Sequence, residues 1–438
     1  MKITLVRSPR LRDGTVALPA PWAGGKVNRL RLGCAAADVR EVRPAWRDEV
    51  ELAADLWDAL SLPYNRIRMR LRRTSPGELE LGPAIAILYA GRESDLSRRT
   101  ARDRAAFYYG HLGSVPGLLA LAFDEDVDLA RGVMTGYVAD NRPGREGEAV
   151  PARFPIPAAV RMAWSIRRDL IGPLREITGD RTFNWVRNMS KWDFHTLLST
   201  VPDLAGHLPD TRRMRSVVDL MAMLARHQSL FVKHAYGIQG RGAVRIQRDE
   251  EGFIALSMRD GAVSEARLED VQALYQHVRS VVGSGVAVVQ QGIPITGREG
   301  RALDFRVLLV RTPDGGWRCA AATANLAPDE RVIFTNLANG ATDEPMEESL
   351  QRHHGLAPEA ARERAAQMVD LCMAAARALE QPFHPLGMLG FDVALEAGSD
   401  RIWLFEANTV PGWGYEGEVD LDLARSQAEY ALALTGFR

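Results

Sequence analysis

The chain has 438 residues, of which 46% are hydrophobic and 25% charged, as in ordinary soluble globular proteins. Its formal net charge of −1 at pH 7 gives no reason to expect nucleic acid or an anionic membrane as the main partner. The opening residues lack the apolar core of a signal peptide, and no apolar run approaches the ~18 residues of a membrane-spanning helix. Cys34, Cys319 and Cys372 have no metal-ligand or redox spacing. We therefore expect a cytoplasmic protein in a reducing compartment, without nucleic-acid or membrane partners.

The pattern of elements divides the chain into three parts of a mixed α/β (α+β) fold class. Residues 1–80 alternate apolar and polar positions in short stretches broken by proline and glycine, which is typical of a small β-rich region. Residues 81–182 alternate strand-like and helix-like runs, which indicates an α/β unit. Its predicted elements are a buried strand over 81–91, a helix around 97–120, a strand over 131–140 and a proline- and glycine-rich connection over 141–157.

The third part, residues 183–438, mixes strands and helices. The expected elements are a short helix capped by Ser190, strands over 229–235 and 243–249 around a glycine turn, an amphipathic helix over 264–281, a buried strand over 285–295, a hairpin with an Asp-Gly-Gly turn over 303–324, a helix over 357–380 and a second hairpin over 389–408. We find no internal repeat in the sequence.

Lysine is rare in this chain. Among 55 basic residues, the lysines are Lys2, Lys26, Lys191 and Lys233, and the others are arginines. Arginine is thus the default positive charge, and an interior lysine is expected to do something that arginine cannot. Lys191 lies near a predicted helix start, where a positive charge is unfavourable for the helix dipole, so it is not expected to stabilise that helix. His195, one turn later, is interpreted as structural.

A glycine-rich turn follows the strand that holds Lys233. Gly237, Gly240 and Gly242 form G-x-x-G-x-G, without the Lys-Ser/Thr pair of the Walker phosphate loop and without the helix that follows a dinucleotide-binding turn. What remains is a β-hairpin flap whose backbone N–H groups could cover phosphates, with Lys233 directed at them. An ordinary glycine hairpin is the alternative interpretation.

The hairpin over 389–408 is expected to hold a metal ion. With the turn centred on Ser399, Asp392 faces Glu406, and Asn408 shares the face of Glu406 because side chains alternate along a strand. Two opposed carboxylates are unfavourable unless a cation lies between them, and hard oxygen ligands suit Mg²⁺ shared with substrate phosphates. A solvated polar face in another register is the alternative. The residues expected on the opposite, apolar face are Phe391, Val393, Trp403 and Phe405.

The preceding hairpin contributes a further pair of charges. Asp304 and Arg306 alternate with apolar residues, so their side chains share one face of a strand. Arg306 could clamp a phosphate or a carboxylate. The alternative is an exposed charge pair on that strand.

In this order, the motifs resemble those of the ATP-grasp ligase superfamily: Lys191, Lys233 with GIQGRG, VVQQGIP, LDFRVLL, FTNLANG, GFDV and LFEANTVPG. Within it, the chain is most similar to the YheC/YheD family of ATP-grasp proteins associated with spore formers, because LGPAIAIL, PIPAAV, FNWVRNMSKW and LPDT also follow that family's order. The resemblance covers most of the chain from about residue 80. It implies an ATP-grasp fold over 183–438, with a lid subdomain at about 205–290, in which two α+β subdomains clamp ATP. A pre-ATP-grasp α/β domain over 81–182 and the β-rich region over 1–80 would precede it.

The resemblance also implies a role for each matching residue. Lys191 and Lys233 would hold the ATP phosphates, under a flap that includes Gly237, Gly240, Arg241 and Gly242. The hinge strand against adenine would be Gln290, Gln291, Gly292 and Ile293, and Asp304 would line the nucleotide site. The ligands of Mg²⁺ would be Asp392, Glu406 and Asn408. The catalytic residues would be Arg306, Lys233 and Asn336, which stabilise charge during phosphoryl transfer.

Three positions depart from the family pattern. Asn325 stands where an arginine is expected, which removes a positive charge from the acyl-phosphate site. Ala341 replaces a second glycine, and Arg241 replaces the common lysine of the flap. The change at Asn325 bears on turnover and on the type of substrate.

The function that the resemblance implies is an ADP-forming ligase, dependent on ATP and Mg²⁺. It would activate a small-molecule or peptide carboxylate as an acyl phosphate and join it to an amine or a similar nucleophile, in the cytoplasm or in association with a spore. An oligomer is compatible with the sequence. One alternative is a nucleotide-binding structural or spore-coat-associated protein without ligase turnover, and another is a kinase. Acceptor contacts are expected in residues 1–80, 342–355 and 411–418.

Overall fold

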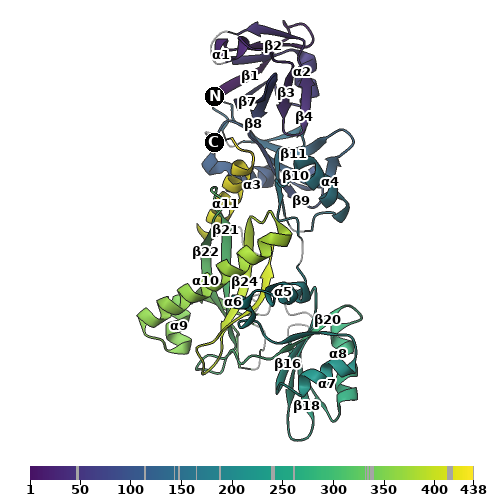
Figure 1. Cartoon of the computed structure of the whole chain (residues 1–438), viewed down its shortest axis with the longest axis vertical. Helices are drawn as coiled ribbons and strands as arrows, with labels where there is room; N and C mark the ends of the chain where they lie inside the picture. Colours follow the sequence, from purple (N-terminus) through teal and green to yellow (C-terminus); the bar gives the residue numbers. More distant parts are fainter. Residues whose placement is uncertain are drawn as a thin grey trace.

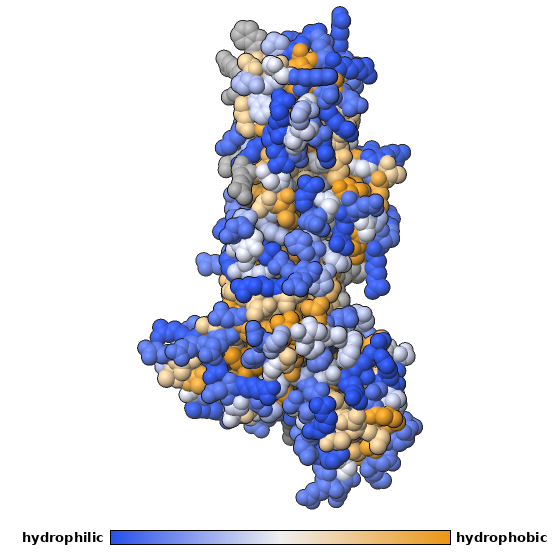
Figure 2. All heavy atoms as spheres, in the orientation of Figure 1, coloured by the Kyte–Doolittle hydropathy of each residue, from blue (hydrophilic) through white to orange (hydrophobic). Residues whose placement is uncertain are grey.

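The computed structural model describes residues 1–45, 49–112, 115–142, 144–146, 148–163, 165–186, 189–237, 242–259, 262–330, 332, 335, 340–411 and 418–437. In these ranges, four β-sheets follow one another along an elongated molecule (Figure 1). Seen from the same side, most of the surface is hydrophilic (Figure 2). No helix in the described ranges is both long and apolar enough to cross a membrane.

The first sheet lies in the region that the sequence analysis expects to be rich in β-strands. Its order is β4-β3-β8-β7-β1-β6-β2-β5. Strand β7 shows the period-2 pattern that the sequence predicts, because Ile67, Met69 and Leu71 are buried and the arginines between them face the other way. The elements are β1 (Lys2–Arg7), β2 (Thr15–Leu18), α1 (Ala20–Ala23), β3 (Arg29–Leu32), β4 (Ala35–Asp38), β5 (Glu41–Pro44), β6 (Glu49–Leu52), α2 (Ala54–Ala59), β7 (Arg66–Ser75) and β8 (Glu78–Gly82).

The second sheet has the order β12-β11-β10-β9-β13-β14, with β9 parallel to both β10 and β13. Its elements are β9 (Ala84–Tyr89), α3 (Arg98–Tyr109), β10 (Leu118–Asp128), β11 (Val133–Ala139), β12 (Ala149–Pro155), β13 (Ala159–Met162), α4 (Arg168–Thr178) and β14 (Thr182–Phe183). Short 3-10 turns, η1 (Glu93–Asp95) and η2 (Gly110–Leu112), flank α3. The alternation of strands and helices is as predicted.

Three predicted boundaries in this region are wrong. The apolar run over 81–91 is not one strand, because β8 of the first sheet ends at Gly82 and β9 of the second begins at Ala84. The helix expected to reach residue 120 ends at Tyr109, because the apolar run from Leu118 forms a buried parallel strand and periodicity alone does not separate the two. The connection expected over 141–157 contains β12, which pairs with β11.

The first two sheets share one hydrophobic core. Leu5 and Leu30 from the first sheet belong to the same buried cluster as Leu118 and Val160 from the second. The other face of the second sheet packs against α3 and against α11 (Glu418–Leu434), with Tyr109 and Ala428 in that core. Helix α11 follows the last strand of the molecule, so the final part of the fold returns to the second sheet (Figure 1).

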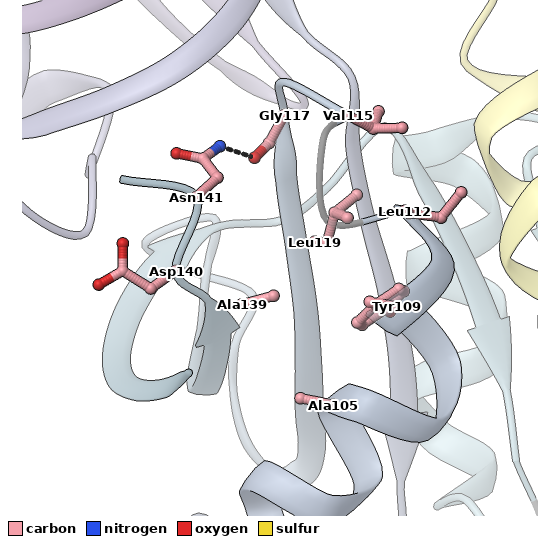
Figure 3. A pocket seen from close by; sticks show the side chains of 9 residues that line it. All are labelled: Ala105, Tyr109, Leu112, Val115, Gly117, Leu119, Ala139, Asp140 and Asn141. Atoms are coloured by element: carbon pink, nitrogen blue, oxygen red, sulfur yellow. Dashed lines mark hydrogen bonds between the residues drawn. The ribbon is translucent and has the colours of Figure 1, made fainter. Parts of the chain in front are cut away.

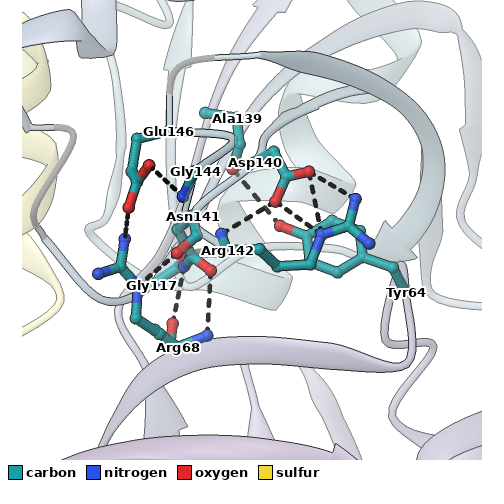
Figure 4. Close-up of polar contacts among 9 residues, drawn as sticks. All are labelled: Tyr64, Arg68, Gly117, Ala139, Asp140, Asn141, Arg142, Gly144 and Glu146. Carbon is teal, nitrogen blue, oxygen red and sulfur yellow. Dashed lines mark hydrogen bonds and ion pairs between the residues drawn. The ribbon is translucent and has the colours of Figure 1, made fainter.

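A polar network closes the junction between the first two sheets (Figure 4). The buried Asn141 side chain accepts from the Arg68 backbone N–H at 3.0 Å, and donates to the carbonyls of Arg68 at 2.8 Å and Gly117 at 2.9 Å. The Arg68 guanidinium also pairs with Glu146 at 3.2 Å. A cavity of about 10 Å³ lies beside Asn141, lined largely by apolar side chains that include Ala105 and Tyr109 (Figure 3). That volume has room for about one water molecule, so it is no substrate site.

The third sheet has the order β15-β20-β16-β17-β18-β19 and a core of its own with helices α7 and α8. The strands predicted over 229–235, 243–249 and 285–295 are confirmed. The helix expected over 264–281 is corrected: residues 262–268 form edge strand β19, whose alternating exposed charges resemble an amphipathic helix face in the sequence. The elements are β15 (Thr211–Met214), α7 (Val217–Leu224), β16 (Ser229–His234), β17 (Ala243–Arg248), β18 (Phe253–Arg259), β19 (Ala262–Leu268), α8 (Val271–Val282) and β20 (Ala287–Gln291).

The fourth sheet has the order β23-β22-β21-β24-β25, and the long helix α10 covers one of its faces. Both predicted hairpins are confirmed, and Gly315 in the Asp-Gly-Gly turn has a φ of 87°. The elements, with two helices that precede the third sheet, are α5 (Lys191–Leu198), α6 (Pro202–Ala205), β21 (Leu303–Arg311), β22 (Trp317–Leu326), β23 (Thr342–Pro345), α9 (Met346–His354), α10 (Pro358–Phe383), β24 (Met388–Leu395) and β25 (Ile402–Asn408). Cys34, Cys319 and Cys372 are free thiols.

Candidate functional site

The β24–β25 hairpin brings the predicted carboxylates together. Asp392 pairs in register with Glu406, and Asn408 lies opposite Gly390, as the sequence predicts for the polar face. Beyond Asp392 the register shifts by one residue, because Val393 pairs with Leu404 and Phe405 is left as the extra residue of a β-bulge. The carboxylate pair therefore lies next to a local irregularity of the strand.

Because of the bulge, half of the predicted apolar face is wrong. Phe391 and Val393 are in the core of the fourth sheet, as expected, but Leu404 and Ile402 join them there in place of Trp403 and Phe405. A slip of one residue moves each later side chain to the opposite face of a strand. The ring of Phe405 consequently lies on the charged side, where its centroid is 5.9 Å from Lys233 Nζ.

Arg306 lies beside the carboxylate pair on the neighbouring strand. It is in register with Asp392 on β24, so three adjacent strands present Arg306, Asp392 and Glu406 in one row. Its Nε is 2.6 Å from Asp392 Oδ1. Burial raises the pKa of Asp392 well above its usual range, and the Glu406 and Asp304 carboxylates add to this, while Arg306 opposes it.

Lys191 reaches the carboxylates from the first turn of α5. Ser190 caps this helix as predicted, accepting from the Asp193 N–H at 2.9 Å. The Lys191 ammonium is 2.8 Å from Glu406 Oε2 and donates to the Gly237 carbonyl, also at 2.8 Å. Burial opposes ionisation of Glu406, but Lys191 and Lys233 outweigh it and lower the pKa of Glu406 to about 2.

Lys233 enters from the third sheet on β16. Its ammonium donates to Gln290 Oε1 at 3.2 Å and is 5.1 Å from the centroid of the Phe231 ring. Burial lowers the pKa of Lys233 to about 8, and the Lys191 ammonium contributes in the same direction, while Glu406, Asp392 and Asp304 oppose it. Lys233 thus has a neutral amide as its hydrogen-bonded partner, whereas Lys191 has a carboxylate.

Asp304 is held by neutral donors. Asn325, its register partner on β22, donates to Oδ1 at 2.9 Å, and the Thr335 hydroxyl donates to Oδ2. Burial raises the pKa of Asp304 against these hydrogen bonds. Asn325, where the resemblance led us to expect an arginine, therefore contributes an amide that fixes a carboxylate. Thr335 and Phe405 are site residues that the sequence did not indicate by themselves, although Thr335 stands in the quoted FTN motif.

The segment Gln290–Ile293 connects the two sheets that form the site. Gln290 donates to Thr211 Oγ1 at 3.1 Å while it accepts from Lys233, and Gln291 accepts from the Asp210 N–H at 3.3 Å. Gly292 lies so close to Ser229 that a Cβ would come within 2.4 Å of its hydroxyl oxygen, and Ile293 is buried. Of these residues, Gln290 is the one that contacts the charged cluster through Lys233.

The flap is partly described. Gly242 has a φ of 64°, a backbone conformation that favours glycine, and Gly237 accepts from Lys191. Gly240, Arg241 and Asn336 lie outside the described residues, as does most of the expected acceptor segment over 411–418.

The predicted Mg²⁺ ligands fit a hard cation by their chemistry. No group of three or more His, Cys, Asp or Glu side chains in the described ranges is placed to hold a metal ion. The predicted set instead has two carboxylates, Asp392 and Glu406, and the amide oxygen of Asn408. Two adjacent carboxylates with few other ligands suit a cation that completes its coordination with phosphate oxygens.

Comparison with known proteins places these features in a family. The family model described as YheC/D-like ATP-grasp matches residues 179–434, which is more than half of the chain. The endospore coat-associated protein YheD of Bacillus subtilis (strain 168) is 24% identical over 229 residues, covering 51% of this chain and 48% of that protein. This chain thus aligns with about half the length of that relative.

Solved structures of ligases are also similar. D-cycloserine synthetase DcsG gives a TM-score of 0.45 at 15% identity, covering 80% of this chain and 99% of that one. The D-alanine-D-alanine ligase of Coxiella burnetii gives 0.39 at 14% identity, covering 75% and 86%. The family match rests on the sequence itself and includes Lys191, Lys233, Asp392 and Glu406. The chain belongs to the YheC/D-like ATP-grasp family.

Proposed function

We propose that this protein is an ATP- and Mg²⁺-dependent ligase that activates a carboxylate as an acyl phosphate and joins it to an amine. One observation supports this most directly. Three cations, Lys191, Lys233 and Arg306, converge from two sheets and a helix on the carboxylate pair Asp392 and Glu406. Phosphoryl transfer needs positioning and charge neutralisation more than covalent chemistry by the protein, and such a cluster supplies both.

The proposed roles follow from where the cations lie. Lys191 and Lys233 would hold phosphate oxygens of ATP, and Gly237 and Gly242 would let the flap fold over them. Gln290 to Ile293 would lie along the adenine. Arg306 would face the transferring phosphoryl group and the acyl phosphate, where a fixed guanidinium stabilises developing negative charge.

The reaction then has two steps. A carboxylate oxygen of the first substrate attacks the γ-phosphorus of ATP, and ADP leaves. An amine nitrogen attacks the carbonyl carbon of the acyl phosphate, inorganic phosphate leaves, and the nitrogen loses a proton. Asp304, fixed by Asn325 and Thr335, would line the site beside these groups.

The proposed metal site consists of Asp392, Glu406 and Asn408. Mg²⁺ bound there would neutralise negative charge on the phosphates during transfer. Without it, Asp392 contacts Arg306 and Glu406 contacts Lys191.

The test couples nucleotide turnover to both substrates. Purified protein is incubated with ATP, Mg²⁺ and mixtures of carboxylates and amines, and the release of ADP and phosphate is measured. A ligase forms ADP when both substrate classes are present, and the Lys233→Met variant should not. The matched control, Lys26→Met, replaces an exposed lysine and should behave as wild type.

The scarcity of lysine offers a second measurement. Amine-reactive labelling read by mass spectrometry reports on Lys233 with Lys26 as an internal reference. ATP with Mg²⁺ should protect Lys233 and leave Lys26 unchanged. The proposal would be wrong if the protein did not bind ATP and if ATP with Mg²⁺ did not protect Lys233 from labelling.

A second candidate is a nucleotide-binding, spore-coat-associated protein without ligase turnover. Asn325 favours it, because a neutral amide stands where the family pattern has an arginine, and the relative YheD is described as endospore coat-associated. This candidate predicts ATP binding and protection of Lys233 without ADP release for any pair of substrates. A spore association would apply to either candidate, with the cytoplasm as the other location.

A further inference from the structure

The two carboxylates proposed as metal ligands already have counter-cations in the protein itself. Lys191 Nζ is 2.8 Å from Glu406 Oε2, and Arg306 Nε is 2.6 Å from Asp392 Oδ1. The side chains of both pairs are largely screened from solvent, with exposed fractions of 16% and 26% for the first pair and 25% and 15% for the second. At such distances and burial, each cation stabilises the charged form of the carboxylate that it contacts, although burial opposes this at Asp392.

The third cation is arranged differently. Lys233 is bonded to the neutral Gln290 side chain and not to either carboxylate, although Glu406 and Asp392 are near enough to influence its charge. Among the residues that the structure describes, the cluster therefore separates Lys233, which forms no ion pair, from two cations that each form an ion pair with one carboxylate. A phosphate entering the site can bond to Lys233 without breaking an ion pair, but it must compete for Lys191 and Arg306.

Resting on the proposed function, we propose that Lys191 and Arg306 are resident counter-cations that occupy Glu406 and Asp392 until a nucleotide draws them away. The free protein then binds a divalent cation weakly. The phosphates of the nucleotide take over the two basic side chains, and the carboxylates become available to the metal ion in the same step.

The physical basis of this coupling is the charge balance at the two carboxylates. With Lys191 and Arg306 in place, each carboxylate already faces a cation, so a divalent cation alone would add a double positive charge to a partly buried site that already holds these two cations. It would also have to leave the displaced ammonium and guanidinium without an anion. A nucleotide polyphosphate supplies that anion, so metal and nucleotide bind better together than either does alone.

The Lys191 contact with the flap extends this coupling. The same ammonium that pairs with Glu406 donates to the Gly237 carbonyl at 2.8 Å, and the Lys191 backbone N–H donates to the Ala235 carbonyl at 2.9 Å. Movement of the ammonium toward a phosphate releases both Glu406 and Gly237. The metal site and the start of the flap therefore respond to one side chain.

The experiment measures Mn²⁺ binding to the whole protein without nucleotide. Mn²⁺ takes the oxygen ligands that suit Mg²⁺, and free Mn²⁺ is counted by electron paramagnetic resonance. Wild-type protein should bind weakly, and Lys191→Met and Arg306→Met should each bind about ten-fold more tightly or better, as expected for removal of a cation in direct contact with a ligand carboxylate. The matched controls are Lys26→Met and Arg377→Met, at exposed positions, and should bind as wild type.

A conservative variant separates lost charge from lost structure. Lys191→Arg retains the cation and should bind Mn²⁺ as weakly as wild type, and thermal unfolding checks that every variant is folded. If Lys191→Met does not fold, Arg306→Met and Lys191→Arg decide the question. The proposal is overturned if wild type binds Mn²⁺ as tightly as the methionine variants, or if those variants bind no more tightly than wild type.

Failure here differs from failure of the ligase proposal. Binding of ATP with Mg²⁺ and turnover test the ligase, and neither enters the Mn²⁺ titration of the free protein. Wild-type protein that turns over ATP, yet binds Mn²⁺ tightly before nucleotide, would remain a ligase without resident counter-cations. If Mn²⁺ binds weakly to wild type and more tightly to Lys191→Met and Arg306→Met, the result supports the resident counter-cations. This holds whether or not a substrate pair has been found.

Discussion

The two main junctions between sheets in this molecule are held together by different kinds of contact. The first and second sheets share a single hydrophobic core and a hydrogen-bonded network around Asn141. The third and fourth sheets have separate main cores, and the contacts between them at the site are polar: Lys233 with the carboxylate cluster, the Gln290–Ile293 connection, and Lys191 between Glu406 and Gly237. Away from the site, one small apolar cluster also joins them, in which Val263 of β19 packs against Ala302 and Ala327. A continuous apolar core moves as one body, whereas charged contacts can be exchanged for ligand atoms. The first junction is therefore a fixed scaffold, and the second is where a ligand can change the structure.

The largest expected effect compares one substitution in the two kinds of core. Leu118 in the shared core and Leu230 in the core of the third sheet are both fully buried. Leu→Ala at either position should cost about 2–5 kcal/mol of local stability, because it removes apolar contacts and leaves a cavity. Hydrogen exchange read by mass spectrometry should show lost protection in both of the first two sheets for Leu118→Ala, but within residues 211–291 alone for Leu230→Ala.

Volume-conserving variants at the same positions serve as controls. Leu118→Met and Leu230→Met should cost less than about 1.5 kcal/mol each. If Leu230→Ala also lowered protection throughout the fourth sheet, the two cores would behave as one, and the contrast between the junctions would be wrong.

The next effect concerns the charged junction. Lys233→Met removes a charged donor at the nucleotide site and should weaken ATP binding by about 10- to 100-fold, the usual cost of a hydrogen bond to a charged group. Isothermal calorimetry with ATP and Mg²⁺ measures it, with Lys26→Met as the control. Unchanged affinity would mean that Lys233 does not contact the nucleotide. Protection in the first two sheets should be the same in both variants.

A smaller effect tests the fixed junction. Asn141→Ala should cost about 1–3 kcal/mol, because it leaves the Arg68 and Gly117 carbonyls without their donor in a buried place. Chemical denaturation measures the loss. Gly144 and Glu146 are nearby on a more exposed loop, so Glu146→Ala, which removes an exposed ion pair with Arg68, should cost no more than about 1 kcal/mol. Neither variant should alter ATP affinity. A change in affinity would show that the two junctions are energetically coupled.

The smallest effect is a pH dependence of nucleotide binding. Burial lowers the pKa of Lys233 to about 8, so the ammonium that would hold a phosphate is present below pH 8 and is lost as the pH rises through that value. ATP affinity should hold steady from pH 7 to nearly 8 and then fall by up to about ten-fold per pH unit. Lys233→Arg, which keeps its charge throughout, should remove this fall. An unaltered fall in that variant would assign the titration to another group.

The sequence was sufficient for the parts of the site that depend on alternation along a strand. Asp392 was predicted opposite Glu406, and Asp304 and Arg306 on one face, and both follow from period-2 geometry. The bulge at Phe405 could not be predicted, because residues 402–405 are all apolar, so the shift in alternation leaves no mark in the sequence. For the same reason Trp403 was placed on the wrong face.

Part of the fold could likewise be predicted from the sequence. The hairpins and the buried strands were marked by turn residues and apolar runs. The strand from Leu118 and edge strand β19 were taken for helix, since a short apolar run and an alternating charged run each suit both structures until their neighbours are known. The ion pairs Lys191–Glu406 and Arg306–Asp392 join elements far apart in the chain, so no local pattern contains them.

One contact near the two marked ends in Figure 1 has a consequence for synthesis. Arg72 donates to the carbonyl of Thr435 at 2.9 Å, and its guanidinium lies 4.1 Å from the centroid of the Phe437 ring. Thr435 leaves the ribosome 363 residues after Arg72, and Phe437 follows it, which at about 5–20 residues per second is a delay of tens of seconds. Through that interval strand β7 lacks these two partners, and the pairing of Arg72 with Glu80 at 2.7 Å gives the guanidinium an anion in the meantime. A region that is made early in this sequence is thus completed by residues that are made several hundred residues later.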